Sequence, residues 1–218
     1  MQRMRVAIAG GHGRIALGLT RLLREHGDEV VSLIRNPDHA DDVREAGGEP
    51  IVCDLESGSA QDVAEAISGV DAVVFAAGAG PGSGPDRKET MDYGGAVKLI
   101  EAAKADGISR YVIVSSMGAD PNHEGDDTFS AYLRAKGRAD AALQASGLEY
   151  TIVRPGMLTD EPGTGAVQIG DQRGEIPRDD VAAVLHTVLH NPATTGWTFG
   201  VTAGDLPVDR LADALAGA

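Results

Sequence analysis

The sequence predicts an α/β protein with a doubly wound parallel sheet, helices on both faces and a small C-terminal annex on the substrate side. Short β-branched apolar runs alternate with longer amphipathic stretches rich in alanine and leucine through most of the 218 residues, which is the pattern of repeated strand–helix units. Most of the apolar runs are nearly continuous, as expected for parallel strands buried on both faces. Glycine, at 29 residues, occurs at roughly twice its usual share of about 7%.

The individual elements follow from these patterns in chain order. We expect strands at Arg5–Ala9, Glu29–Ile34, Glu49–Cys53, Ala72–Ala76, Arg110–Ser115, Glu149–Val153 and Thr198–Val201. We expect helices at Arg14–His26, Asp38–Ala46, Ser59–Ser68, Thr90–Asp106, Ser130–Ser146, Asp179–His190 and Val208–Leu215. A glycine follows most of these helices, where a left-handed residue without a Cβ ends the helix. No repeat or linker divides the elements, so residues 1–218 are predicted to form a single domain.

Two glycine-rich segments are predicted to border the site. Residues 78–85 follow the fourth expected strand, and residues 155–174 follow the sixth. In doubly wound folds, ligands bind beyond the carboxyl ends of the strands. We therefore expect both segments to enclose a substrate, with residues 155–177 as an inserted loop region on the substrate side. The alternative is that both are plain surface loops.

Composition and charge exclude several classes of function. The formal net charge is 19 − 33 = −14, and a polyanion repels the phosphate backbone of nucleic acids. The single cysteine cannot form an internal disulfide, and no apolar run approaches the roughly 18 residues that a membrane span needs. We expect a cytoplasmic protein, a monomer or homodimer, that acts on a small molecule and binds neither nucleic acid nor membrane.

The strongest motif is a glycine turn between the first expected strand and the first expected helix. Gly10 permits a tight turn, Gly13 lets the backbone approach a pyrophosphate at the helix N-terminus, and Ala16 permits close packing of helix on strand. This context predicts a Rossmann-type dinucleotide-binding domain, with a glycine turn that holds no ligand as the alternative. The candidate cofactor contacts in the turn are Gly10, Gly11, His12, Gly13, Arg14 and Ile15.

The end of the second expected strand predicts which dinucleotide binds. NAD-specific proteins place a carboxylate there for the ribose 2′-hydroxyl, whereas this strand ends in Arg35 and Asn36. A guanidinium suits a 2′-phosphate, and Arg14 is placed to hold the same group from the other side. We therefore expect NADP(H) to be preferred over NAD(H). The alternative is that Arg35 is a solvated surface charge and that the site does not discriminate.

Two further strand ends are predicted to contact the cofactor. Asp54 and Leu55 follow the third strand, where they would flank an adenine ring, although Asp54 equally suits a turn cap. Ala76, Ala77 and Gly78 follow the fourth strand, and their small side chains permit a close approach of the backbone to the cofactor. The residues at these two strand ends extend the candidate cofactor site beyond the glycine turn.

A serine, tyrosine and lysine constellation predicts the chemistry. Ser115 and Ser116 end the fifth strand, and Tyr132 and Lys136 lie one turn apart on the following helix. Residues i and i+4 share a helix face, so the phenol and the ammonium would project together into the cofactor cleft. A positive charge next to a phenol favours the ionised phenol. The alternative is that the pair lies on an exposed helix face.

Taken in order, these motifs resemble the short-chain dehydrogenase/reductase superfamily, and within it the compact, atypical NAD(P)H-binding branch similar to NAD-dependent epimerases/dehydratases. The resemblance includes residues 153–156 and 176–182 and spans nearly the whole chain. It implies that Pro155, Gly156 and Met157 border the cofactor.

The same resemblance implies roles for the constellation. Tyr132 would be the general acid/base, Lys136 would hold the nicotinamide ribose and tune Tyr132, and Ser116, in preference to Ser115, would orient a substrate oxygen. Asp92 stands where the superfamily usually has an asparagine. An ion pair between Asp92 and Lys136 would weaken the action of the lysine on Tyr132.

These residues predict an NADP(H)-dependent oxidoreductase that acts on a small carbonyl, quinone or flavin-like acceptor. The first alternative is a regulatory protein that binds NADP(H) without turnover. The second is a sugar-nucleotide epimerase or dehydratase, although only 218 − 155 = 63 residues follow Pro155, which is few for a domain that binds a nucleotide sugar.

We expect no metal site. His186 and His190 have the i, i+4 spacing of two histidine ligands, but Thr187 stands where a zinc-protease helix needs glutamate. No third ligand is evident nearby in the sequence. Cys53, at the end of a strand, is expected to be a small core residue.

Overall fold

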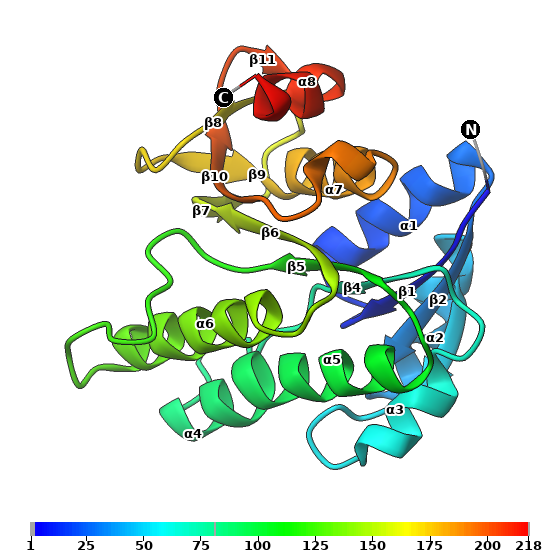
Figure 1. Cartoon of the computed structure of the whole chain (residues 1–218). Helices are drawn as coiled ribbons and strands as arrows, with labels where there is room; N and C mark the ends of the chain where they lie inside the picture. Colours follow the sequence, from blue (N-terminus) through cyan, green and yellow to red (C-terminus); the bar gives the residue numbers. More distant parts are fainter. Residues whose placement is uncertain (1–2, 81, 218) are drawn as a thin grey trace.

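The fold is a nearly parallel sheet between two layers of helices (Figure 1). The computed structural model describes residues 3–80 and 82–217. Within these residues the main sheet has nine strands in the order β11-β8-β10-β6-β5-β4-β1-β2-β3, and β7 pairs with β9 in a small second sheet. The strands are β1 (Arg5–Ala9), β2 (Glu29–Ile34), β3 (Glu49–Val52), β4 (Ala72–Phe75), β5 (Arg110–Val114), β6 (Glu149–Pro155), β7 (Met157–Thr159), β8 (Ala166–Ile169), β9 (Glu175–Pro177), β10 (Thr198–Ala203) and β11 (Leu206–Pro207).

The helices connect these strands and cover both faces of the sheet. The α-helices are α1 (Arg14–His26), α2 (Ala40–Glu45), α3 (Ala60–Ala66), α4 (Pro85–Arg87), α5 (Ala96–Ala105), α6 (Thr128–Gln144), α7 (Arg178–Leu189) and α8 (Leu211–Ala216). Short 3₁₀ segments are η1 (Pro37–His39), η3 (Pro192–Thr194) and η4 (Val208–Arg210), and η2 (Lys88–Gly95) is a π-helix that runs directly into α5.

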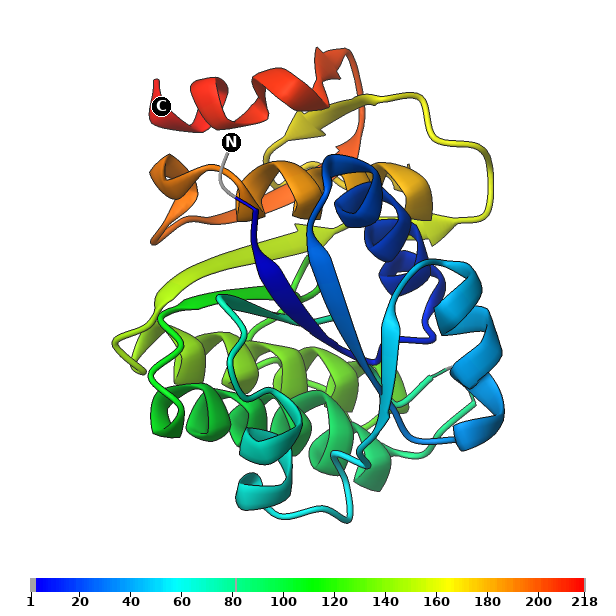
Figure 2. The same ribbon diagram turned by 90° about the vertical axis from the view of Figure 1, so that its right-hand side faces the viewer.

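Alternate residues of each strand enter two separate cores, because successive side chains of a strand point to opposite faces of the sheet. On β1, Ala7 and Ala9 pack with α3, α5 and α6, whereas Val6 and Ile8 pack with α1, α7 and α8. Figure 2 shows these two helical layers on either side of the strands. All seven strands expected from the sequence are present, and neighbours among them run parallel. The predicted doubly wound Rossmann architecture is therefore confirmed.

The expectation that residues 155–177 form a loop region is wrong for much of that segment. Strands β7, β8 and β9 lie within it, and β8 joins the main sheet antiparallel to β10 and β11. Each of these strands has only three or four residues and depends on a partner far along the chain, so no local periodicity reveals it. Part of this segment is consequently paired into the two sheets, after the carboxyl end of β6. No helix in the described part of the chain is long and apolar enough to cross a membrane.

Candidate functional site

The glycine turn between β1 and α1 packs against two neighbouring strand ends. Gly10 has a φ of +79°, and a Cβ at this position would lie 2.6 Å from the Cα of Ala77. A Cβ at Gly11 would lie 2.5 Å from the Cβ of Ser32, which is closer than side chains tolerate. The turn therefore requires glycine for two reasons, a left-handed backbone and close approach to the residues after β4 and within β2.

The N-terminus of α1 is suited to a phosphate group. Gly13 is its N-cap and offers no side-chain hydrogen bond, and the first turn carries Arg14 and no acidic residue. The free amide groups and the positive end of the helix dipole favour an anion at this position. The residues present therefore fit the pyrophosphate of a dinucleotide.

A pocket of about 760 Å³ lies at the carboxyl edge of the sheet. Its walls come from the segment after β4, the π-helix η2, the end of β5, helix α6 and the start of β7. Pro81 of the predicted loop 78–85 lies outside the described residues. The lining residues are Ala76, Ala77, Gly78, Ala79, Gly80, Gly82, Ser83, Gly84, Lys88, Asp92, Val114, Ser115, Thr128, Phe129, Tyr132, Lys136 and Leu158.

Helix α6 brings Tyr132 and Lys136 to this pocket. Asp127 caps the helix by accepting hydrogen bonds from the backbone amides of Phe129 and Ser130 at 2.8 and 2.9 Å. The Lys136 ammonium lies 5.9 Å from the centroid of the Tyr132 ring and donates to the Val114 carbonyl at 3.0 Å. The two side chains predicted to act together are therefore adjacent on the same pocket wall.

Asp92 pairs with Lys136 from the facing π-helix. Its Oδ1 lies 3.4 Å from the Lys136 Nζ, and both side chains are almost completely buried. Its Oδ2 accepts a hydrogen bond from the Ala79 amide at 3.2 Å. The ion pair anticipated from the sequence is therefore present. π-Helical turns of this kind are rare and often occur at functional sites, and this one turns Asp92 inward to the lysine.

The two serines after β5 are in different environments. Ser115 is buried and lines the pocket, and its hydroxyl donates to Asp140 Oδ2 at 2.8 Å. The Ser116 hydroxyl donates to the Met117 carbonyl at 3.2 Å. The sequence favoured Ser116 for contact with a substrate, whereas of the two serines only Ser115 is among the residues that line this pocket.

Asp140 was not identified from the sequence. It lies one turn beyond Lys136 on α6, and its Oδ2 accepts from Ser115 and from the Arg154 guanidinium at 2.8 to 2.9 Å. Burial raises the pKa of Asp140, against the lowering effect of Ser115 and Arg154. The i, i+4 spacing from Lys136 is the only sequence feature that could have indicated its place beside the constellation.

The two arginines predicted to hold a 2′-phosphate each pair with a carboxylate. Arg35 Nη1 lies 3.3 Å from Glu56 Oε2, and the Arg14 guanidinium pairs with Asp160. Both arginines are more than half exposed. The side chain of Asn36 is engaged in capping η1, where it accepts from the Asp38 amide at 3.1 Å. The structure therefore places the two guanidinium groups at the surface, each within reach of solvent.

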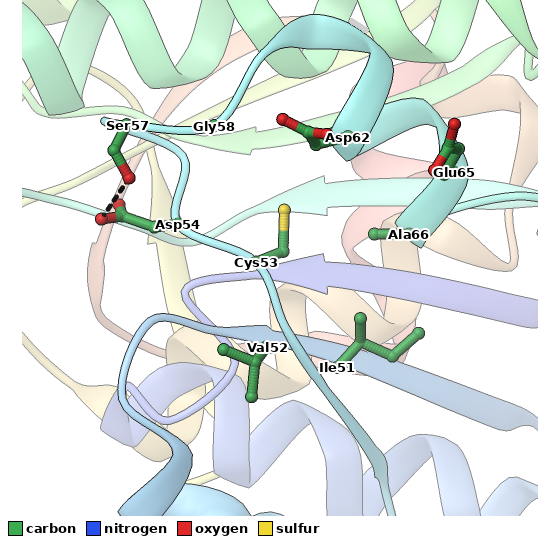
Figure 3. A pocket seen from close by; sticks show the side chains of 9 residues that line it. All are labelled: Ile51, Val52, Cys53, Asp54, Ser57, Gly58, Asp62, Glu65 and Ala66. Carbon is green, nitrogen blue, oxygen red and sulfur yellow. Dashed lines mark hydrogen bonds between the residues drawn. The ribbon is translucent and has the colours of Figure 1, made fainter.

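A second pocket, of about 510 Å³, lies between the end of β3 and helix α3 (Figure 3). Asp54 lines it, but its carboxylate closes a turn by accepting from the Glu56 amide and the Ser57 hydroxyl, both at 2.9 Å. Asp54 therefore has the turn-capping position considered as an alternative, and Leu55 is buried in the core. Cys53 is also buried, and burial raises the pKa of its thiol.

The remaining candidate cofactor residues are distributed around the first strands and β6. His12 pairs with Asp42 at 2.7 Å and stacks on His39, while Ile15 packs against the core beneath α1. The amides of Gly156 and Met157 donate to the carbonyls of Val201 and Gly174. Pro155 is the buried last residue of β6. These backbone groups therefore hold the wall beside the pocket in place.

Comparison with known proteins identifies the family. A model described as NAD(P)H-binding matches residues 10–192, which is most of the chain. The chain belongs to this NAD(P)H-binding family. A curated relative, the uncharacterized sugar epimerase YhfK of Bacillus subtilis, is 38% identical over 208 residues, covering 94% of this chain and 97% of YhfK.

Solved structures of similar proteins agree with the fold. A Bacillus halodurans protein named as an NAD-dependent epimerase/dehydratase is 38% identical, covers 97% of this chain and 99% of its own, and superposes with a TM-score of 0.90. ChuY, named as an anaerobillin reductase from Escherichia coli O157:H7, is 26% identical, with coverage of 93% and 98% and a TM-score of 0.78. The resemblance to Rossmann-fold dehydrogenases/reductases noted in the sequence is therefore confirmed.

Sequence reasoning also missed a histidine cluster in this NAD(P)H-binding chain. His186 and His190 lie beside His26 and Asp28, so the expectation that no third ligand is nearby is wrong. The packing of α1 on α7 brings together residues 162 positions apart. Burial, together with the neighbouring His190 and His26, lowers the pKa of His186 to about 4.

Proposed function

We propose that the chain is an NADP(H)-dependent oxidoreductase that acts on a small carbonyl, quinone or flavin-like acceptor. The observation that carries this proposal is the position of Tyr132 and Lys136 on one wall of the pocket beside Ala77, which packs against the glycine turn. A ligand held at the turn and extending along this wall meets the phenol and the ammonium at its far end. The preference for NADP(H) is supported by Arg14 and Arg35, which lie at the surface near that turn.

Each side chain has a distinct role in the proposed reaction. When bound, NADPH supplies a hydride to the electrophilic carbon of the acceptor. Tyr132 donates its hydroxyl proton to the carbonyl oxygen of the acceptor, which gains negative charge as the hydride adds to the carbon. This proton transfer balances the charge in that step. Lys136 would hold the ribose hydroxyls and would stabilise the phenolate that remains. Ser115 forms the adjoining wall and positions α6 through Asp140.

The wall of the pocket favours a flat, partly apolar acceptor. Phe129 is 64% exposed and stacks on Tyr132 with 6.0 Å between ring centroids. Leu158 lines the pocket from β7, and Lys88 lies 5.6 Å from the centroid of the Tyr132 ring. Aromatic and apolar walls with the ammonium groups of Lys88 and Lys136 suit a conjugated carbonyl or quinone that carries negative charge. The name of ChuY, an anaerobillin reductase, is in accord with a reductase activity.

The test is NADPH consumption by the purified chain across a panel of quinones, flavins, anaerobillin and small aldehydes. Tyr132→Phe should lower kcat/KM by a factor on the order of 10²–10⁴ on any acceptor that the wild type reduces. The same variant should bind NADPH with an affinity within about threefold of that of the wild type, because the phenol contributes to proton transfer more than to binding. Tyr150→Phe, on β6 away from the pocket, is the matched control. Equal turnover by the wild type and Tyr132→Phe would exclude the proposed mechanism.

A second candidate is a regulatory protein that binds NADP(H) without turnover, and the Asp92–Lys136 ion pair favours it. A carboxylate that neutralises the lysine weakens its action on Tyr132. This candidate predicts NADPH binding, with no oxidation of NADPH by any acceptor in the panel and a partner captured in pull-downs only in one redox state of the cofactor.

The name of YhfK also supports testing a sugar-nucleotide epimerase. Such an epimerase first oxidises its substrate and then reduces the resulting intermediate, so no net NADPH is consumed. Incubation with nucleotide sugars, followed by chromatography of the products, distinguishes this activity from a net reduction.

We further propose that the chain works as a single domain in the cytoplasm, as a monomer or homodimer, with residues 155–177 forming one wall of the substrate site. Its net charge of −14 supports a small-molecule substrate over a nucleic acid.

A further inference from the structure

Four side chains that commonly bind metals lie together at the amino edge of the sheet, opposite the Tyr132 pocket. His26 ends α1, Asp28 precedes β2, and His186 and His190 lie at the end of α7. One donor atom from each lies within 4.8 Å of the others. The nitrogen of His190 and that of His26 lie 2.8 and 3.1 Å from the same carboxylate oxygen, Asp28 Oδ2.

The hydrogen bonds around His190 indicate the role of each ring nitrogen. His190 Nδ1 lies 2.9 Å from the His186 carbonyl, which can only accept, so Nδ1 must carry the proton. In a neutral ring, Nε2 then has a lone pair that faces Asp28 Oδ2 at 2.8 Å. A ring lone pair and a carboxylate oxygen that face each other are two donor atoms that one metal ion can use.

The surroundings hold the donors in place. The Met4 amide donates to Asp28 Oδ1 at 2.9 Å and leaves Oδ2 directed at the histidines. His186 Nε2 is buried with no hydrogen-bond partner among the described residues. A buried ring nitrogen without a partner loses hydration and gains nothing in return, whereas a metal ion would use its lone pair.

Two helix ends add to the local negative potential. The C-termini of α1 and α7 both lie at the cluster, and α1 packs on α7 (Figure 1). The carbonyl end of a helix carries partial negative charge and favours a cation. Hydrogen bonds from ring Nδ1 to a carbonyl and from an amide to a carboxylate are the contacts that commonly orient metal ligands.

We propose that His26, Asp28, His186 and His190 form a structural site for one Zn²⁺ ion. Three imidazoles and one carboxylate are the donor types that Zn²⁺ takes in tetrahedral sites, where bonds of about 2.0–2.1 Å put the donors about 3.4 Å apart. The donor distances here, from 2.8 Å to at most 4.8 Å, bracket that value. The site joins α1 and the start of β2 to α7, and thereby fixes the C-terminal part of the chain to the nucleotide-binding part.

The test uses the full chain, treated with chelator and then titrated with Zn²⁺ alone by calorimetry at about neutral pH. We expect one ion per chain, with zinc X-ray absorption reporting four N/O ligands and no sulfur. Co²⁺ in the same site should give the intense visible bands of tetrahedral coordination. This spectrum needs no variant, so it tests the proposal even if every ligand substitution unfolds the chain.

Variants then assign the ligands. His186→Gln removes the donor without a partner, and should weaken Zn²⁺ binding on the order of 100-fold and abolish the rise in Tm that Zn²⁺ gives the wild type. His190→Gln should have the same effect. His39→Gln and His123→Gln each remove an imidazole elsewhere and should bind Zn²⁺ as the wild type does. Absence of stoichiometric Zn²⁺ binding by the wild type would overturn the proposal, as would equal binding by His186→Gln.

Discussion

The ammonium of Lys136 lies 3.4 Å from the carboxylate of Asp92, and both side chains are almost completely buried. The lysine donates its short hydrogen bond to the Val114 carbonyl instead, at 3.0 Å. The Asp92 carboxylate is therefore close enough to offset the positive charge of the Lys136 ammonium, whereas the hydrogen bond to Val114 orients the ammonium. The pair sets how much positive charge the phenol of Tyr132 experiences.

Replacement of Asp92 by Asn should raise the turnover of the proposed enzyme. The substitution removes a buried negative charge 3.4 Å from the Lys136 ammonium, so the lysine stabilises the phenolate of Tyr132 more strongly and kcat/KM should rise by a factor on the order of 10. The Asn carbonyl can still accept from the Ala79 amide, but the unpaired ammonium should lower the free energy of unfolding by up to about 3 kcal/mol. Asp86→Asn, an exposed change on α4, is the control. An unchanged kcat/KM in Asp92→Asn would show that this carboxylate does not act through Lys136.

Ser115 should matter more than Ser116 for turnover. Ser115 lines the pocket and donates to Asp140 at 2.8 Å, so Ser115→Ala should lower kcat/KM by roughly 10- to 100-fold. Ser116→Ala should stay within about threefold of the wild type. Because Arg154 still binds Asp140 in Ser115→Ala, the variant should keep its fold, which circular dichroism can check. The reverse order of effects would restore Ser116 to the role that the sequence favoured.

Arg35 should make the chain bind NADPH more tightly than NADH. A guanidinium that binds the 2′-phosphate gains a charge-assisted hydrogen bond worth about 1.5–3 kcal/mol, so Arg35→Ala should weaken NADPH binding by roughly 10- to 100-fold and leave NADH binding unchanged. Fluorescence titration with both cofactors measures the difference. Arg21→Ala, which removes an exposed arginine of α1, should change neither affinity. Equal affinity of the wild type for the two cofactors would contradict the NADP(H) preference directly.

Glu56 should stabilise the fold only above the acid range. Burial favours a higher pKa for Glu56, but hydrogen bonds from Arg87 and Thr90 outweigh it and hold the pKa below its ordinary value of 4.5. The folded state therefore binds its proton less readily than the unfolded state, so the stabilisation is complete above about pH 4.5 and is lost as the pH falls through the folded pKa.

Urea unfolding of wild type and Glu56→Gln tests this sign. The wild type should be more stable by at most about 1 kcal/mol at about pH 7, and the difference should shrink as the pH falls below about 4. Glu25→Gln, at an exposed position of α1, should show no such pH-dependent difference. A difference that grows on acidification would mean that the carboxylate is not held ionised by Arg87.

The sequence by itself determined the features that depend on local spacing. The alternation of apolar runs and amphipathic stretches located strands β1 to β6 and β10 of the main sheet within a few residues, because burial on both faces and the helical period show as patterns among neighbouring positions. The glycine turn was recognisable because a left-handed φ and a close approach both require glycine at Gly10. The spacing of Tyr132 and Lys136 fixed a shared helix face, since i and i+4 are one turn apart.

Only the tertiary structure decided which distant side chains meet. The turn after β5 placed Ser115, not Ser116, on the pocket wall, and the short strands β7, β8 and β9 formed only because partners elsewhere in the chain supply their hydrogen bonds. The packing of α1 on α7 brought His190 within 2.8 Å of Asp28 across 162 positions. No periodicity in the sequence encodes such a distance, because it results from how whole helices pack on the sheet and not from the spacing of residues within one element.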